Sequence, residues 1–140
     1  MNSQRPILLV EDNPMDVDLT LRAFARRHIV NPMQIARDGE EALDLVNAWR
    51  EGDPLPAVIL LDLKLPRIDG LEVLRHLKNH PVYQKIPVVM LTTSREDADV
   101  ATAYTLGANS YIVKPVDFEK FMDVATQIQL YWCVLNERAL

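Results

Sequence analysis

The sequence contains one cysteine, Cys133, so no disulfide can form within the chain. A lone thiol is typical of reducing compartments, and we expect a cytoplasmic protein. No apolar run approaches the roughly 18 residues of a membrane-spanning helix, and the amino terminus shows no signal-peptide pattern. Positive charge is not in excess either: the net charge is −5 and the pI is about 5.1. We therefore expect neither a membrane nor nucleic acid among the partners.

Linkers rich in glycine, serine or proline are also missing, as are internal repeats. The chain has 140 residues, of which 49% are hydrophobic and 25% charged. These values are typical of an ordinary globular protein that can bury a core of its own. We therefore predict a single domain over residues 1–140.

An apolar run over residues 57–61 ends abruptly at Asp62. Such a short run suits a strand that is buried on both faces of a parallel sheet. Pro66 prevents a simple continuation, and Asp69-Gly70 is typical of a turn or a helix entry. Asp62 then lies at the carboxyl end of a central strand, where open α/β sheets place their chemistry. Taken alone, Asp62 is equally well explained as a residue that ends the strand and caps a loop.

The rest of the chain alternates between strand and helix signals. Strands are predicted at residues 7–10, 33–36, 57–61, 88–91 and 110–113. Helix starts are predicted at Asn13, Asp38, Asp69 and Asp117, and Ser94 has capping-box spacing to Asp97 for a helix that ends near Gly107. This (βα)₅ alternation predicts the α/β class, with a doubly wound parallel sheet that has helices on both faces.

Four of the five predicted strands end in polar residues at the same rim. These residues are Glu11 and Asp12, Asp62, Thr92, and Lys114. Three carboxylates packed together repel one another, and a hard cation such as Mg²⁺ relieves that repulsion. With a lysine and a hydroxyl added, the set predicts a site for an anionic group, with phosphoryl the natural candidate. Asp62 can then act as the nucleophile and hold the phosphoryl group as an acyl phosphate.

Each member of this set has a more ordinary explanation when it is considered alone. Glu11 and Asp12 suit the start of the following helix, Thr92 suits a strand end, and Lys114 suits a solvated surface. Their joint occurrence at the ends of separate predicted strands favours a shared site.

Four motifs in this order resemble the receiver domain of response regulators in bacterial two-component signalling. They are Leu9-Val-Glu-Asp-Asn, Leu60-Leu-Asp-Leu-Lys-Leu-Pro-Arg-Ile-Asp-Gly, Leu91-Thr-Thr and Tyr111-Ile-Val-Lys-Pro. The resemblance covers roughly residues 6–126 and leaves residues 127–140 as an extension of the last helix. It implies a flavodoxin-like, CheY-like fold with the strand order 2-1-3-4-5.

The resemblance also implies roles for individual residues. Asp62 corresponds to the phosphoacceptor, and Lys114 to the lysine that binds the phosphoryl group. Mg²⁺ is expected at Glu11, Asp12, Asp62 and the backbone carbonyl of Lys64. Thr92 and Tyr111 resemble the hydroxyl and the aromatic residue of the switch, and the bond before Pro115 is expected to be cis.

A subtype is indicated by Asn13-Pro-x-Asp, Leu61-Asp-Leu-x-Leu-Pro, Leu91-Thr-Thr-Ser and an aromatic carboxyl-terminal tail. These features resemble small regulators that are paired with phytochrome-type histidine kinases. Lys64 departs from those regulators, which more often carry asparagine there. Because residues 127–140 are too few for an output domain, we expect a stand-alone receiver that signals through a phosphorylation-dependent interaction surface.

Three other functions compete with this interpretation. A haloacid-dehalogenase-like phosphatase needs a second Asp two residues after its nucleophile, where this chain has Lys64. A flavodoxin-like flavin carrier needs a Ser/Thr/Gly-rich phosphate loop after the first strand, where this chain has Glu11-Asp-Asn-Pro. A degenerate receiver would have lost acceptor-site residues, and all are present. We predict a signalling phosphoacceptor, which assists its own phosphotransfer and dephosphorylation, and no separate enzyme activity.

The last predicted helix carries more apolar surface than one domain needs. Its stripe consists of Phe121, Val124, Ile128, Trp132 and Leu135. The second half of the stripe extends past the sheet, together with Tyr131 and Val134, and it would form an exposed patch. We predict a homodimer through this region; the alternative is that the tail folds back on its own domain.

Overall fold

The computed structural model describes residues 5–137 of the chain. Its strands are β1 (Ile7–Val10), β2 (Met33–Ala36), β3 (Val58–Leu61), β4 (Val88–Thr92) and β5 (Ser110–Val113). Its α-helices are α1 (Pro14–Arg26), α2 (Gly39–Asn47), α3 (Gly70–Lys78), α4 (Asp97–Thr105) and α5 (Phe118–Ile128). A 3₁₀ turn, Tyr83–Lys85, precedes β4, and a π-helix, Gln129–Leu135, follows α5. None of the helices within the described range is long and apolar enough to cross a membrane.

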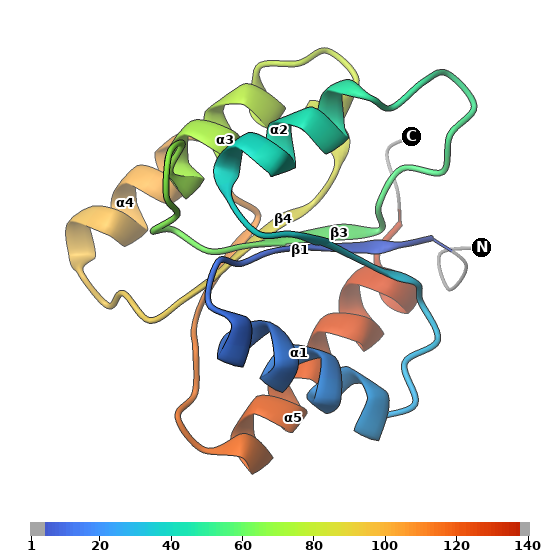
Figure 1. The fold of residues 1–140 in the computed structure, drawn as a ribbon, viewed down its shortest axis with the longest axis vertical. Coiled ribbons are helices and arrows are strands. Elements are labelled where there is room, and N and C mark those ends of the chain that lie inside the picture. The colour runs from blue at the N-terminus through green and yellow to red at the C-terminus, as the bar shows by residue number, and fades with distance from the viewer. Residues whose placement is uncertain (1–4, 138–140) are drawn as a thin grey trace.

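All five strands are parallel and form one sheet in the order β2-β1-β3-β4-β5. Helices α2, α3 and α4 cover one face of this sheet, and α1 and α5 cover the other (Figure 1). The predicted α/β class, the doubly wound topology and the strand order are therefore confirmed.

The central strands are apolar throughout because both of their faces are covered. In β1, Leu8 and Val10 pack into the core under α2, α3 and α4, whereas Ile7 and Leu9 pack against α1 and α5. All residues of β1, β3 and β4 are buried. The sheet therefore has a core on each side, and its chemistry is confined to the strand ends.

Four predicted helix starts are confirmed, and each carries a side-chain cap on the first turn. Asn13, Asp38, Asp69 and Asp117 each accept from backbone N–H groups of the helix that they precede.

The predicted cap at Ser94 is wrong. Helix α4 begins at Asp97 after Glu96, with no side-chain cap. Ser94 lies too far ahead of the first turn to cap it, and its hydroxyl instead donates to the Asp99 carboxylate at 2.5 Å. Asp99 thereby ties the loop before α4 to the helix itself.

Helix α3 approaches the end of β3 so closely that only glycine fits at its first position. The Gly70 N–H donates to the Leu63 carbonyl at 2.7 Å. A Cβ atom on Gly70 would lie 2.0 Å from the Asp62 carbonyl oxygen, far inside van der Waals contact. The missing side chain therefore lets α3 fix the loop that presents Asp62.

The last helix changes its geometry after Ile128. The α-helical spacing predicted to continue to Leu135 ends there, because residues 129–135 adopt wider π-helical turns. This shift buries Cys133, which is 1% exposed, and leaves Leu135 59% exposed.

The predicted cis bond before Pro115 is also wrong, because no peptide bond among residues 5–137 is cis. A trans bond is the intrinsic preference before proline, by about 0.5–1 kcal/mol. With that bond trans, the Lys114 N–H donates to the Thr92 carbonyl at 2.8 Å, and its side chain still reaches the carboxylates at the strand ends.

Candidate functional site

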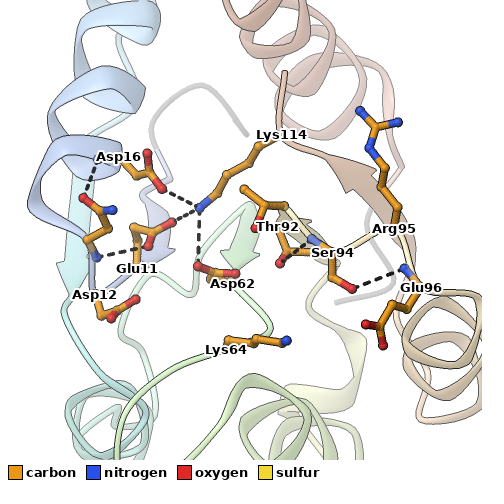
Figure 2. A pocket seen from close by; sticks show the side chains of 12 residues that line it. Glu11, Asp12, Asp16, Asp62, Lys64, Thr92, Ser94, Arg95, Glu96 and Lys114 are labelled. Atoms are coloured by element: carbon orange, nitrogen blue, oxygen red, sulfur yellow. Dashed lines mark hydrogen bonds and ion pairs between the residues drawn. The ribbon is translucent and has the colours of Figure 1, made fainter. Parts of the chain in front are cut away.

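The carboxyl ends of β1, β3, β4 and β5 surround one open pocket of about 530 Å³ (Figure 2). Its lining comprises Glu11, Asp12, Asn13, Asp16, Asp62, Lys64, Thr92, Thr93, Ser94, Arg95, Glu96 and Lys114. Every polar strand-end residue that the sequence singled out is in this set. The parallel sheet brings them together because all of its strands end at the same edge.

The Lys114 ammonium is the centre of the hydrogen-bond network. It donates to the carboxylates of Glu11, Asp16 at 3.0 Å and Asp62 at 3.3 Å. Figure 2 shows these three carboxylates converging on the nitrogen. The Lys114 side chain is only 7% exposed, so its charge is buried, and each of its three N–H donors has a partner of opposite charge.

Asp16, the third carboxylate bonded to Lys114, has no role that is predicted from the sequence. It lies in the first turn of α1, three residues after the Asn13 cap. The Asn13-Pro-x-Asp motif fixes its place on the helix. Its partner Lys114 lies 98 residues away, so local spacing alone does not reveal the contact.

Burial and charge pull the pKa values of this network in different directions. Burial raises the pKa of Glu11 to about 7, opposed by the hydrogen bond from Lys114 and reinforced by the Asp62 charge. Burial alone would lower the pKa of Lys114, but the hydrogen bond to Glu11 and the charges of Asp62 and Glu11 raise it overall. Lys114 is therefore protonated at neutral pH and offsets part of the negative charge around Asp62.

Three carboxylates form a cluster suited to a metal ion. Glu11, Asp12 and Asp62 each offer an oxygen, and these oxygens lie within 4.8 Å of one another. Asp12 is exposed and Asp62 half-buried, so the cluster opens toward solvent. An all-oxygen, anionic and solvent-accessible set of ligands fits a hard divalent cation that keeps some of its water.

The two predicted switch residues hold the loop between β4 and α4. The Thr92 hydroxyl is buried and accepts from the Ser94 N–H at 3.4 Å. The Tyr111 hydroxyl donates to the Ser94 carbonyl at 3.0 Å. Burial raises the pKa of Tyr111, so this hydroxyl keeps its proton at neutral pH. Both side chains therefore meet the loop at Ser94.

Lys64 is exposed at the mouth of the pocket. Figure 2 shows its side chain on the opposite side of Asp62 from Lys114. Asp62 thus has a lysine on each side, one buried among carboxylates and the other facing solvent.

A family model, described as the response regulator receiver domain, matches residues 7–126. The chain belongs to the response-regulator receiver family. This assignment excludes the phosphatase and the flavin carrier that compete at the level of sequence. Members of this family are phosphoacceptors of two-component signalling, and that is the function of this protein. Receiver domains take their phosphoryl group from histidine kinases and bind a divalent metal ion.

Two curated relatives match this receiver over nearly its whole length. The probable methanogenesis regulatory protein FilR2 of Methanothrix harundinacea is 43% identical over 93% of this chain and 84% of its own. The response regulator Rcp1 of Synechocystis is 37% identical over 94% of this chain and 90% of its own.

Solved structures show the same fold. The phosphorylated cyanobacterial phytochrome response regulator RcpA is 34% identical, with a TM-score of 0.89, over 98% of this chain and 99% of its own. The Mn²⁺-bound form of Rcp1 is 35% identical, with a TM-score of 0.86, over 97% of this chain and 99% of its own. The bacteriophytochrome response regulator AtBRR is 48% identical, with a TM-score of 0.75, over 96% of this chain and 99% of its own. This receiver is therefore similar to regulators that are named for phytochromes.

Proposed function

We propose that Asp62 is the phosphoacceptor of this receiver and that Mg²⁺ is the metal ion it uses. The observation that carries the proposal is the 3.3 Å hydrogen bond from Lys114 to Asp62 inside a cluster of carboxylates. An Asp62 oxygen attacks the phosphorus of a kinase phosphohistidine, the P–O bond forms, and the P–N bond breaks. The imidazole leaves with the bonding electron pair and then takes a proton from solvent.

The other residues of the pocket serve this transfer. Glu11, Asp12, Asp62 and the backbone carbonyl of Lys64 would hold Mg²⁺, which supplies positive charge to the transferring phosphoryl oxygens. Lys114 donates to one of those oxygens, and Thr92, at the end of the neighbouring strand, provides a hydroxyl donor.

We propose a phytochrome-type histidine kinase as the donor, because RcpA and AtBRR, the regulators it resembles, are named for phytochromes. The test is phosphotransfer from a panel of labelled kinases, phytochrome-type and others, to the wild-type receiver with Mg²⁺ and with EDTA. Preferential labelling by a phytochrome-type kinase is expected. Labelling that EDTA does not reduce would contradict the metal requirement.

The lone, buried Cys133 supports a cytoplasmic location.

Phosphorylation is expected to change the conformation of the loop between β4 and α4 at Ser94. The Thr92 hydroxyl moves to a phosphoryl oxygen, and Tyr111 gives up the Ser94 carbonyl and turns into the vacated space. Amide hydrogen exchange, measured with and without beryllium fluoride and Mg²⁺, should change most over α4, β5 and α5. An Asp62→Asn variant treated in the same way should not change. A response confined to α1 and α2 would refute this switch.

Lys64 is expected to prolong the life of the acyl phosphate. Its ammonium lies across Asp62 from Lys114, where it would cover phosphoryl oxygens and obstruct attacking water. Replacing Lys64 with Asn should speed autodephosphorylation by about three- to tenfold, the size expected for one lost charged contact. The exposed Lys85→Asn variant is the charge-matched control. Equal lifetimes for wild type and Lys64→Asn would show that Lys64 simply faces solvent.

The carboxyl-terminal segment is proposed to form a homodimer. Its half-exposed apolar side chains are Leu130, Tyr131, Val134 and Leu135. Of these, Tyr131 lines a groove of about 560 Å³ between β5 and α5, together with Trp132 and Ile112. An apolar patch of this kind is commonly covered by a second copy of the same chain.

Sedimentation at tens of micromolar tests the dimer. The intact protein should sediment as a dimer, and a chain truncated after Gln129 as a monomer. Because truncation also removes the buried Cys133, a Leu135→Asp variant should be measured as well, with Tyr104→Asp as the control for an equally exposed apolar residue elsewhere. If the intact chain is monomeric, the tail is intramolecular packing or a kinase-docking surface.

A further inference from the structure

The backbone of Asp16 is held at the edge of the pocket by two local hydrogen bonds. Its N–H donates to the Asn13 side chain at 3.3 Å, and its carbonyl accepts from the Thr20 hydroxyl at 2.7 Å. The Asp16 carboxylate is 32% exposed, and its hydrogen-bond partner among residues 5–137 is the Lys114 ammonium. These two bonds fix the point on the backbone from which the Asp16 side chain reaches Lys114.

The other two carboxylates bonded to Lys114 differ from Asp16 because a metal ion can also bind them. Glu11 and Asp62 belong to the cluster that can hold a divalent cation, and Asp16 does not. A cation bound to Glu11 and Asp62 therefore competes with the ammonium for the same oxygens. Lys114 has three N–H donors, and Asp16 is the carboxylate that stays available to it.

We propose that Asp16 is a positioning residue for Lys114: it holds the ammonium beside Asp62 when a divalent cation takes Glu11 and Asp62. The inference rests on the proposed function of Asp62 and its metal ion. Asp16 lowers the free-energy cost of metal binding. When the ion displaces the Lys114 ammonium from Glu11 and Asp62, the ammonium still has Asp16 as an anionic partner. Asp16 also leaves Lys114 within reach of a phosphoryl oxygen on Asp62.

A carboxylate that acted only through its charge would behave differently. Such a charge would attract the cation whether or not Lys114 were present. It would also repel an anionic phosphoryl donor, so its removal would speed phosphorylation. If Asp16 positions Lys114, its removal should slow phosphorylation. Its effect on metal affinity should also depend on the presence of Lys114.

The first measurement is a double-mutant cycle on Mn²⁺ affinity, read from the signal of free Mn²⁺ by electron paramagnetic resonance. Asp16→Asn should weaken Mn²⁺ binding by about three- to tenfold in the wild-type background, a coupling typical of residues in contact. The same change in a Lys114→Gln background should cost about twofold or less, because no ammonium is left to hold. Equal losses in both backgrounds would overturn the proposal.

The second measurement is the rate of phosphorylation by acetyl phosphate at saturating Mg²⁺. Asp16→Asn should slow it by about threefold or more, because Lys114 is no longer held in place. Asp18→Asn, on the same helix in an exposed pair with Arg22, is the charge-matched control and should behave as wild type. An unchanged or faster rate in a folded Asp16→Asn protein would overturn the proposal. If wild type takes no label at Asp62, the proposed phosphoacceptor itself has failed, which is a distinct result.

Discussion

Asp62→Asn is expected to abolish phosphorylation of this receiver by histidine kinases and by small donors such as acetyl phosphate. The amide has no anionic oxygen to attack phosphorus, and it also removes one carboxylate from the metal cluster with Glu11 and Asp12. A nucleophile loss of this kind typically costs at least about a thousandfold in rate. Phosphate-affinity electrophoresis or intact-mass measurement would show the loss.

The control for Asp62→Asn is Asp69→Asn, seven residues later in the same loop. Asp69 caps α3 by accepting from the Glu72 N–H at 3.1 Å, a bond that an Asn side chain preserves, so labelling should persist. In the wild type, hydroxylamine should remove the label, as it does for an acyl phosphate. Asp12→Asn should mainly weaken metal binding, because Glu11 and Asp62 remain. Label that survives in Asp62→Asn would place the acceptor elsewhere.

Gly70→Ala is expected to destabilise this receiver strongly. The added Cβ would lie 2.0 Å from the Asp62 carbonyl oxygen and 2.9 Å from Leu63 backbone atoms. Backbone on both sides cannot yield cheaply, so α3 must move away from the end of β3. We expect the free energy of unfolding to fall by about 2–4 kcal/mol, as for severe overpacking. Urea denaturation followed by circular dichroism measures this loss.

The same substitution should also impair the site, because the displaced atoms belong to Asp62, the proposed phosphoacceptor, and to the residue that follows it. Phosphorylation of the folded fraction of Gly70→Ala should therefore be slower than that of wild type. Gly52→Ala is the control: its Cβ meets nothing within 4 Å, and its cost comes from the backbone φ of +93°. That cost is about 1 kcal/mol, with phosphorylation unchanged. If Gly70→Ala and Gly52→Ala lowered the free energy of unfolding equally, the close approach of α3 to the end of β3 would not contribute to stability.

Local sequence patterns are enough to predict the helices and strands and the residues at their ends. Apolar runs that stop at a polar residue located the strands within a residue, as with the run that ends before Asp62. Asn13, Asp38 and Asp117 located helix starts because a cap bonds to N–H groups only two or three residues away. Glu11, Asp12, Asp62, Thr92 and Lys114 followed from the strands, because parallel strands end at one edge. All of these features depend on local chain geometry and its period.

The tertiary structure sets the features that local sequence patterns do not contain. It brought Asp16 to Lys114 across 98 residues, and it placed the Gly70 backbone against the Asp62 carbonyl. It also overruled local spacing at Ser94, whose hydroxyl bonds to Asp99 instead of capping α4, and at Ile128, where the α-helix widens and buries Cys133. The contact between Asp16 and Lys114 joins groups far apart along the chain, and a sequence pattern of short range does not contain such a contact.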